Sequence, residues 1–369
     1  MKKKILMTII ISVLAFAFFS SCADRNLGEP DSEPEQTETE APTPTPEPTP
    51  TEAPTPTPVP EDTTSPFFIN INRDAWLAVG SEFNINDFVS YIDDHDAEID
   101  LDIVGQVDPT VLGSYHLDLT ITDDYGNTSS DYINVTVYQP SGDGSSSPQT
   151  GTSTANATPF STFMASYPGE GIHYGIDVSK WQGAIDWQQV ADAGCEFAFI
   201  RAGWSSEGEF HEDEYFVANM EGATAAGIPI GVYVYTTDNT EEYVTALADT
   251  ICDLCDGYNV QLPIVFDWEN FFNSFQKYHL SIADINVLYR TFEARVESRG
   301  YSSMIYGSKF IFDVIWEDDI LDVWLAHYTT QTDYNGFYRV WQQSCTGTIP
   351  GIDAYVDMDM YFGDLPGGN

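Results

Sequence analysis

The C-terminal half of the chain alternates between two hydrophobic periodicities, and this alternation limits the folds available to it. From about residue 172 onward, short apolar runs typical of strands are separated by longer amphipathic stretches typical of helices. Apolar strands joined by helices favour a parallel sheet. The predicted strands cover residues 174–179, 197–202, 228–235, 262–268, 302–307, 322–328, 338–344 and 357–362, and the predicted helices 184–194, 213–227, 240–258 and 281–300.

The number of predicted strands suggests that this sheet closes into a barrel. The early strands are separated by helical stretches, whereas the last three have short connections. We therefore predict an α/β fold over residues 172–369, a TIM-like (β/α)5β3 barrel. In such barrels, functional side chains collect at the C-terminal ends of the strands.

A second, all-β module is predicted upstream, over residues 66–139. Residues 115–123 and 132–138 alternate apolar and polar side chains as half-buried strands do, and "DDYGN" (123–127) reads as the turn between them. These two strands resemble the last two strands of small bacterial immunoglobulin-like modules. The resemblance implies an immunoglobulin-like β-sandwich that acts as a spacer or adhesion unit.

The remaining segments are predicted to be linkers and a targeting signal. Residues 22–65 are rich in Pro, Thr and Glu, and residues 140–171 begin with a Gly/Ser/Thr-rich run, so we expect both to be linkers. Residues 1–21 combine a basic start with an apolar run and resemble a bacterial lipoprotein signal peptide. That resemblance implies lipid attachment at Cys22; an ordinary secretory signal is the alternative. Either way, we predict an exported protein.

The charge of the chain excludes one class of partner. The formal net charge is −45, with only 13 Lys and Arg residues. Because phosphate backbones would repel such a chain, we predict no binding of nucleic acid. We also expect membrane contact only through the lipid anchor, and a monomer.

Cysteines and acidic clusters give no metal or redox prediction. Cys252 and Cys255 are three residues apart in a predicted helix, a spacing that seldom suits a disulfide, so we expect the thiols at Cys195, Cys252, Cys255 and Cys345 to be buried and structural. The acids around His95 in "YIDDHDAEID" raise the option of a Ca²⁺ site, but their spacing fits no known loop motif. We predict no metal and no cofactor.

Acidic and aromatic residues recur at the predicted strand ends. The most informative pair is Asp267 and Glu269 in "VFDWE", because residues i and i+2 of a strand share a face and Trp268 then points the other way. Two adjacent carboxylates in a partly apolar cleft cannot easily both ionise, so one pKa should rise. Glycoside hydrolysis needs such a protonated acid beside a carboxylate. An isolated D-x-E pair more often caps a strand through hydrogen bonds to backbone amides, so the motif alone does not establish a glycosidase.

Together with other motifs in the chain, this pair resembles a known protein family. "GIDVSKWQGAIDW" (175–187), "AGIPIGVYVY" (226–235), "VFDWE" (265–269), "WLAHY" (324–328) and "VDMDMYFG" (356–363) occur in the order seen in glycoside hydrolase family 25 lysozymes. The resemblance implies N-acetylmuramidase activity, the hydrolysis of β-1,4 bonds between N-acetylmuramic acid and N-acetylglucosamine. It also implies peptidoglycan as the partner.

Site roles follow from the same resemblance. Glu269 matches the general acid/base, and Asp267 matches the acid that orients or stabilises the 2-acetamido group of the substrate. Asp177 and Asp357 match further active-site acids, and Asp359 stands where the family often has Asn. The resemblance gives substrate-binding positions at Tyr233, Tyr235, Trp324, Gln342 and Arg201, although Arg201 could instead pair with an acid at the mouth.

Two other functions are compatible with the sequence. One is a wall-binding or adhesion protein whose barrel has lost activity. The other is a related barrel that acts on chitin-like glycans.

Overall fold

A computed structural model describes residues 62–140, 157–269, 274–320 and 322–366. The proposed signal segment, Cys22, residues 22–61 of the first linker and residues 141–156 of the second lie outside the described residues. Among the residues described, none of the helices has the length and hydropathy of a membrane span.

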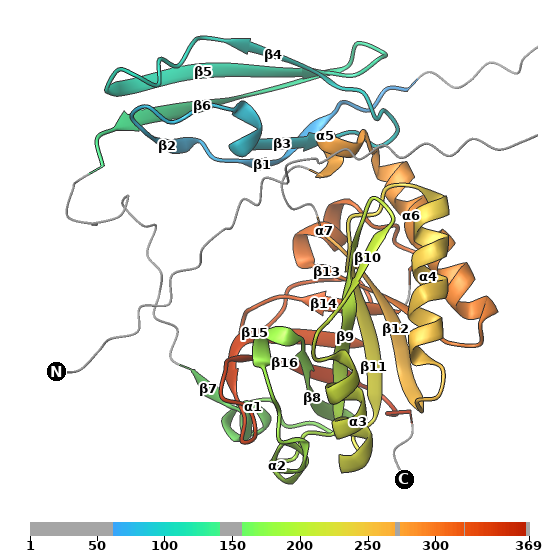
Figure 1. The fold of residues 1–369 in the computed structure, drawn as a ribbon. Coiled ribbons are helices and arrows are strands. Elements are labelled where there is room, and N and C mark those ends of the chain that lie inside the picture. Colours follow the sequence, from blue (N-terminus) through green and yellow to red (C-terminus); the bar gives the residue numbers. More distant parts are fainter. Residues whose placement is uncertain (1–61, 141–156, 270–273, 321, 367–369) are drawn as a thin grey trace, which may run out of the picture. The chain divides into compact units, whose positions relative to one another are not determined.

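The C-terminal region forms a closed ring of eight strands, as the sequence predicts (Figure 1). In ring order, each strand pairs with the next and the last pairs with the first. The strands are β8 (Ile172–Val178), β9 (Phe197–Ser206), β11 (Ile230–Thr236), β12 (Val260–Trp268), β13 (Ser303–Ser308), β14 (Val323–Ala326), β15 (Val340–Thr348) and β16 (Val356–Phe362).

The first seven strands of the ring run parallel, and β16 runs antiparallel to both of its neighbours, β15 and β8. The start of β16 therefore reaches the same mouth of the barrel as the ends of the other strands. Two additional strands, β7 (Thr158–Pro159) and β10 (Glu209–Glu212), pair with β15 and β9. The sequence analysis did not predict these two.

Helices follow most of the parallel strands. The four predicted helical stretches form α2 (Trp187–Asp192), α3 (Phe216–Ala226), α4 (Glu241–Cys255) and α6 (Ile282–Ser298). Three short helices were not predicted: α1 (Phe160–Ser166), α5 (Ser274–Tyr278) and α7 (Lys309–Val314).

The helices α4 and α6 lie side by side on the outside of the ring (Figure 1). Their contact combines apolar packing with ion pairs from Arg295 and Arg299 of the α6 end to Asp249 of α4, at 2.7 and 2.9 Å. Ser281 caps α6 with a reciprocal bond pair to Asp284, which satisfies backbone donors at the helix start.

Side chains fill the interior of the ring. Phe197, Phe199, Val265, Met304 and Trp324 are all buried there. Space for these rings comes from small residues on neighbouring strands: a Cβ at Gly175 would lie 2.6 Å from the Phe197 ring. The barrel is thus a packed core below an open mouth, and not a pore.

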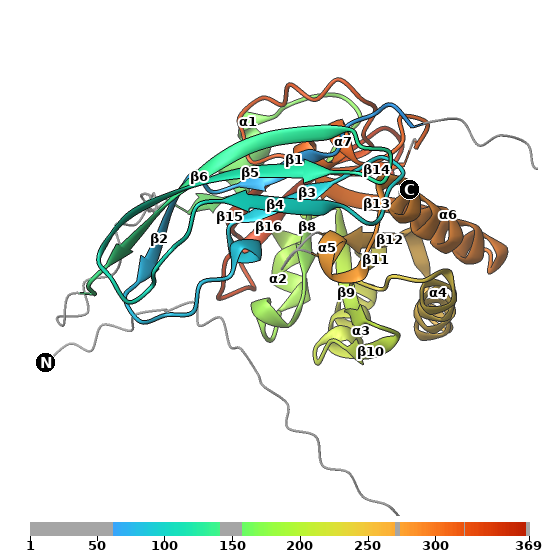
Figure 2. The ribbon, with the colours of Figure 1, turned by 90° about the horizontal axis from the view of Figure 1, so that it is seen from above.

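The region upstream of the barrel is a β-rich module. Its two sheets are β1 (Phe67–Ile71) paired with β3 (Val89–Ile92), and the order β2 (Asp74–Ala78), β6 (Thr128–Tyr138), β5 (Gly113–Thr122), β4 (Asp100–Val104). A short 3₁₀ turn, η1 (Ile85–Asp87), precedes β3. Figure 2 shows β5 and β6 as long neighbouring strands, and they pair antiparallel along their whole length.

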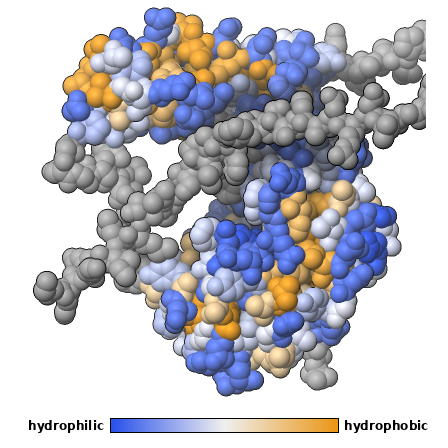
Figure 3. All heavy atoms as spheres, in the orientation of Figure 1, coloured by the Kyte–Doolittle hydropathy of each residue, from blue (hydrophilic) through white to orange (hydrophobic). Residues whose placement is uncertain are grey.

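The predicted hairpin of this module is confirmed. Alternate residues of β5 and β6 are buried, including Leu119, Ile121 and Ile133, and the turn at 123–127 joins the two strands. The face of the module seen in Figure 3 mixes hydrophilic and hydrophobic residues.

Three of the four cysteines expected to be buried are buried: Cys195, Cys252 and Cys255. The expectation is wrong for Cys345, which is exposed. Cys345 lies on β15 next to the barrel mouth, where the strand is not covered by a helix, and its side chain lines a cleft described below.

Candidate active site

The D-x-E pair lies at the C-terminal end of β12, at the mouth of the ring. Asp267 is 7% exposed, and Glu269 directly follows the strand and is partly exposed. The two carboxyl groups are hydrogen-bonded to each other. Trp268, between them, points to the opposite face, where it is buried and packs on Phe275 with ring centroids 5.0 Å apart.

Burial and mutual repulsion make this pair hold a proton. Burial, followed by the charges of Glu269 and Asp177, raises the pKa of Asp267 well above its usual value. Burial raises the pKa of Glu269 to about 7. Because the two groups share a hydrogen bond, they titrate as a unit. Near neutral pH the pair therefore carries one proton and one negative charge.

Two more acids reach the same mouth from β8 and β16. Asp177 and Asp357 are directly opposite each other in the antiparallel register of these strands. Burial raises the pKa of Asp177 to about 6 and that of Asp357 to about 8, the latter helped by the charge of Asp177. At neutral pH this places one carboxylate, Asp177, beside one protonated acid, Asp357.

Gln342 holds Asp177 in position. Its Nε2 donates to Asp177 Oδ2 at 2.7 Å, while its Oε1 accepts from the hydroxyl groups of Tyr306 and Tyr328 at 2.9 and 2.8 Å. Two hydroxyl donors on the carbonyl oxygen fix the orientation of the amide, so the NH₂ group must face the carboxylate. Gln342 is 4% exposed, so its position favours support of Asp177 over the predicted contact with substrate.

Trp324 has a similar supporting position. It is 1% exposed, stacks on Phe199 with centroids 4.5 Å apart, and its Nε1 donates to Asp359 Oδ1 at 2.8 Å. Burial raises the pKa of Asp359 well above its usual value, with a further contribution from Asp177. The predicted role of Trp324 as a substrate contact does not fit this burial; the ring packs below the mouth and holds Asp359.

Arg201 forms an ion pair that the sequence analysis left open. Its Nε and Nη2 atoms lie 2.8 and 2.6 Å from Asp213 Oδ2, and the Asp213 side chain is fully buried. Asp213 also accepts the backbone N–H groups of Lys180 and Tyr215, both at 3.0 Å. The positive charge of Arg201 lowers the pKa values of Asp177 and Asp267 against the effect of burial.

These groups lie around a cleft of about 560 Å³ at the barrel mouth. Most of the predicted site residues line it, and further lining residues come from the segment after β8, from β15 and from the segment before β16. The lining residues are Asp177, Ser179, Trp181, Gln182, Arg201, Tyr233, Tyr235, Asp267, Cys345, Tyr355 and Asp357.

Several of these positions were not predicted from the sequence. Trp181 (71% exposed) and Tyr355 (55% exposed) present aromatic rings at the cleft. Asp213 holds Arg201, and Tyr306 holds Gln342. Trp181 lies inside the quoted motif "GIDVSKWQGAIDW", so its position next to the strand end could have signalled it. Asp213 directly follows β10, a strand that was not predicted, so its position carried no such signal.

No grouping of cleft residues has metal-ligand spacing. In the part of the chain that the structure describes, two groups of acids and histidines are close enough to share an ion. Both lie in the β-rich module, and their members are Asp62, Asp93, Asp94, His95 and Asp123.

A ring of α/β barrel strands with paired, proton-sharing acids at its mouth has the features of a glycosidase site. The family described as Glycosyl hydrolases family 25 matches residues 176–352. Lysozyme M1 of Streptomyces globisporus is 33% identical over 202 residues, which cover 51% of this chain and 67% of that protein. The uncharacterised protein YegX of Escherichia coli K12 is 31% identical over 218 residues, which cover 56% of this chain and 76% of that protein.

The chain therefore belongs to glycosyl hydrolase family 25. Among solved structures, the bacterial lysozyme of Streptomyces coelicolor is 29% identical, with a TM-score of 0.46, and the match covers 53% of this chain and 94% of that one.

Proposed function

We propose that this protein is a lysozyme, an N-acetylmuramidase that hydrolyses β-1,4 bonds between N-acetylmuramic acid and N-acetylglucosamine in peptidoglycan. The observation that carries the proposal is the hydrogen-bonded pair of Asp267 and Glu269 at the barrel mouth, with pKa values raised for both. Membership of family 25 and the resemblance to Lysozyme M1 support the choice of substrate.

Glu269 is the general acid in this proposal. It is the less buried member of the pair, so it is the more accessible to the glycosidic oxygen, while Asp267 lines the cleft beside it. A pKa of about 7 lets Glu269 carry a proton at neutral pH and give it up in the transition state. After the leaving group departs, Glu269 as a carboxylate takes a proton from the attacking water.

The closeness of the pair favours a reaction in which the substrate supplies its own nucleophile. An enzymatic nucleophile and an acid on opposite sides of a sugar need roughly 5–5.5 Å between their carboxyl groups. Asp267 and Glu269 are instead in hydrogen-bond contact. Asp267 then orients the 2-acetamido group and stabilises its developing positive charge, while the ionised Asp177 adds negative potential near the oxocarbenium-like centre.

The cleft offers contacts for a glycan chain. Tyr233, Tyr235 and Arg201 line it beside the acids, and the exposed rings of Trp181 and Tyr355 suit stacking on sugar faces. We propose that Asp357, whose pKa is about 8, donates a hydrogen bond to the substrate as a neutral acid.

The remaining architecture is proposed on the sequence patterns. The ring is a TIM-like (β/α)5β3 barrel over residues 172–369, and the module over 66–139 is immunoglobulin-like. The mature protein is exported and held at the extracellular face of the cell membrane through Cys22. Residues 22–65 form one linker, and the part of 140–171 that precedes β7 forms the other. It acts as a monomer, without cofactor, in remodelling or lysis of cell walls.

The test is hydrolysis of purified peptidoglycan by wild type and by Glu269→Gln. We expect the variant to lose activity at least 1,000-fold, on the order of what loss of a catalytic acid costs, while circular dichroism and thermal unfolding stay close to wild type. Mass spectrometry of the products should find muramic acid at the new reducing ends. Wild-type rates in Glu269→Gln would contradict the assignment.

An inactive wall-binding protein is the second candidate. The exposed rings at the cleft would serve such a role without chemistry. It would be favoured if wild type sediments with cell wall but releases no reducing sugar. A chitin-like substrate would be favoured if the wild type cleaves N-acetylglucosamine polymers and leaves peptidoglycan intact.

A further inference from the structure

The structure gathers six acids at one end of the β-rich module. They come from three segments that are far apart in the sequence: the residues before β1, the turn after β3 and the turn between β5 and β6. The acids are Asp62, Asp93, Asp94, Asp96, Asp123 and Asp124.

Three of these acids each leave one oxygen buried without a hydrogen-bond donor. Asp93 is 0% exposed; its Oδ1 accepts the backbone N–H groups of His95 and Asp96 at 2.9 Å, but its Oδ2 accepts nothing. Asp62 accepts from Thr64 N through Oδ1 and leaves Oδ2 buried and unpaired. Asp94 Oδ1 is also buried and unpaired. The carboxyl groups of Asp93 and Asp94 are hydrogen-bonded to each other. A buried carboxylate oxygen that no other donor reaches is costly, since little replaces its lost hydration.

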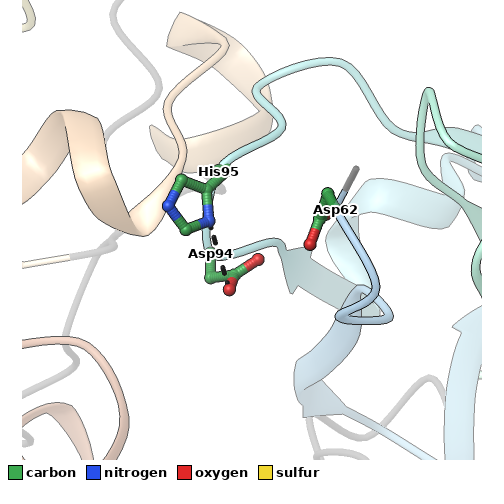
Figure 4. A group of neighbouring side chains, drawn as sticks. All are labelled: Asp62, Asp94 and His95. Atoms are coloured by element: carbon green, nitrogen blue, oxygen red, sulfur yellow. Dashed lines mark ion pairs between the residues drawn. The ribbon is translucent and has the colours of Figure 1, made fainter. Parts of the chain in front are cut away.

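The carboxylates converge. Oxygens of Asp62, Asp93 and Asp123 lie within 4.8 Å of one another, and the same holds for ligand atoms of Asp62, Asp94 and His95. Figure 4 shows Asp62 beside Asp94 and His95, with the Asp94–His95 pair at 3.2 Å drawn as a dashed line. No Lys or Arg of the described residues forms an ion pair with any of the six acids.

We propose that Asp62, Asp93 and Asp123, with Asp94 beside them, form a calcium site that ties the three segments of the module together. Several of the acids are neighbours of His95 in the sequence, whereas Asp62 and Asp123 are distant in sequence and only the fold brings them to the same place.

Calcium fits the donors better than other cations do. The group formed by Asp62, Asp93 and Asp123 offers only carboxylate oxygens, which are the ligands of hard cations. With Ca–O distances of roughly 2.3–2.6 Å, oxygens that share one Ca²⁺ ion lie at most about 4.6–5.2 Å apart. Oxygens of the three carboxylates lie within 4.8 Å of one another, inside this limit. Mg²⁺ keeps most of its waters and seldom uses a cage built from protein alone.

Hydrogen bonds within the β5–β6 turn fix the position of the Asp123 carboxylate. Its Oδ1 accepts the backbone N–H groups of Tyr125 and Asn127 at 2.9 and 2.8 Å, and its Oδ2 accepts Asn127 Nδ2 at 2.8 Å. Asn127 Nδ2 also donates to the backbone carbonyl of Asp62 at 3.2 Å. The β5–β6 turn and the segment before β1 are therefore connected around the proposed ion.

The test is isothermal titration calorimetry of the full chain with CaCl₂ after removal of divalent ions by a chelator. We expect one saturable site with Kd on the order of 10⁻⁴ M or tighter, and a rise in the unfolding temperature of the module on the order of 5 °C in excess Ca²⁺. Absence of a saturable site in wild type would overturn the proposal, whatever the variants do.

Three variants distinguish a specific Ca²⁺ site from nonspecific attraction of Ca²⁺ to an acidic chain. Asp93→Asn and Asp62→Asn each remove one ligand charge and should weaken Ca²⁺ binding at least tenfold. Asp102→Asn removes the same charge from an exposed position on β4 and should bind like wild type. Equal binding by all three variants would overturn the proposal. So would equal affinity for Mg²⁺, or stoichiometric displacement of Ca²⁺ by Zn²⁺ at His95.

Discussion

Asp357, the second residue of β16, lies directly opposite Asp177, near the end of β8, because these two neighbouring strands run antiparallel. In a fully parallel barrel, the start of the last strand would lie at the far end of the ring from the mouth. The reversal of β16 therefore adds a fourth acid to a mouth already occupied by Asp177, Asp267 and Glu269. The pKa of Asp357, raised to about 8 by burial and by Asp177, is a consequence of this register.

Replacing Asp267 by Asn should change the pH dependence of activity as well as its rate. In wild type, loss of the shared proton leaves two adjacent charges, so the pKa for that loss is raised. With a neutral Asn, the same step leaves one charge, and the pKa of Glu269 should fall. We expect the alkaline limb of kcat, near or above pH 7 in wild type, to move to lower pH.

The measurement is a pH–rate profile on soluble peptidoglycan fragments for wild type and Asp267→Asn. kcat should also fall about 100-fold or more because the acetamido group loses its charged partner. An alkaline limb at unchanged pH in the variant would show that the two groups do not share their titration.

Asp359→Asn should stabilise the protein in a pH-dependent way. Burial raises the pKa of Asp359, so its folded form binds a proton more tightly than its unfolded form. The resulting stability is present at low pH and is lost as the pH rises through the folded pKa. An Asn would keep the acceptor for Trp324 Nε1 and could donate to Asp177 without ever ionising.

Thermal or urea unfolding of wild type and Asp359→Asn at pH 4 and pH 8 tests this expectation. The variant should gain about 1–3 kcal/mol in the free energy of unfolding at pH 8 and much less at pH 4. An equal gain at both pH values would mean that ionisation of Asp359 is not its cause.

Gln342→Leu should reduce activity because it changes the pKa of Asp177. The amide lowers the pKa of Asp177, so its loss should raise that pKa above about 6 and move the acid limb of kcat to higher pH. We expect a 10- to 100-fold fall in kcat with little change in KM, because Gln342 is buried and does not line the cleft. Tyr328→Phe, which removes one of two donors to the same amide, is the matched milder control.

If the Gln342→Leu variant has a shifted unfolding temperature but a wild-type pH profile, Gln342 contributes only to packing. A large rise in KM would instead restore the original interpretation of Gln342 as a substrate contact.

The Arg201–Asp213 pair should be needed for folding of the mouth. Arg201→Met leaves the fully buried Asp213 without its cation and should cost about 3–5 kcal/mol of unfolding free energy. The double variant Arg201→Met/Asp213→Asn removes both charges and should recover part of that loss. Urea unfolding of the single and double variants gives the coupling, and strictly additive losses would contradict a direct pair.

Much of the barrel could be predicted because each of its elements carries a local signal. Apolar runs such as 262–268 and amphipathic stretches such as 281–300 correspond to β12 and α6 because strand and helix periods are properties of neighbouring residues. The face shared by Asp267 and Glu269 follows from the same period of two. The short elements β7, β10 and α1 were missed because they depend on pairing or packing with distant segments and have little pattern of their own.

The sequence by itself determined the order of strands and helices, the positions of the acids at strand ends and the membership of family 25. Each of these depends on the pattern of residues within short contiguous segments. The tertiary structure decided which distant residues meet. It placed Asp357 opposite Asp177, Gln342 behind Asp177 and Trp324 under Asp359, paired Arg201 with Asp213, and brought Asp62 to Asp93 and Asp123. Burial and neighbouring charge set the pKa of each acid, and both are properties of the folded chain.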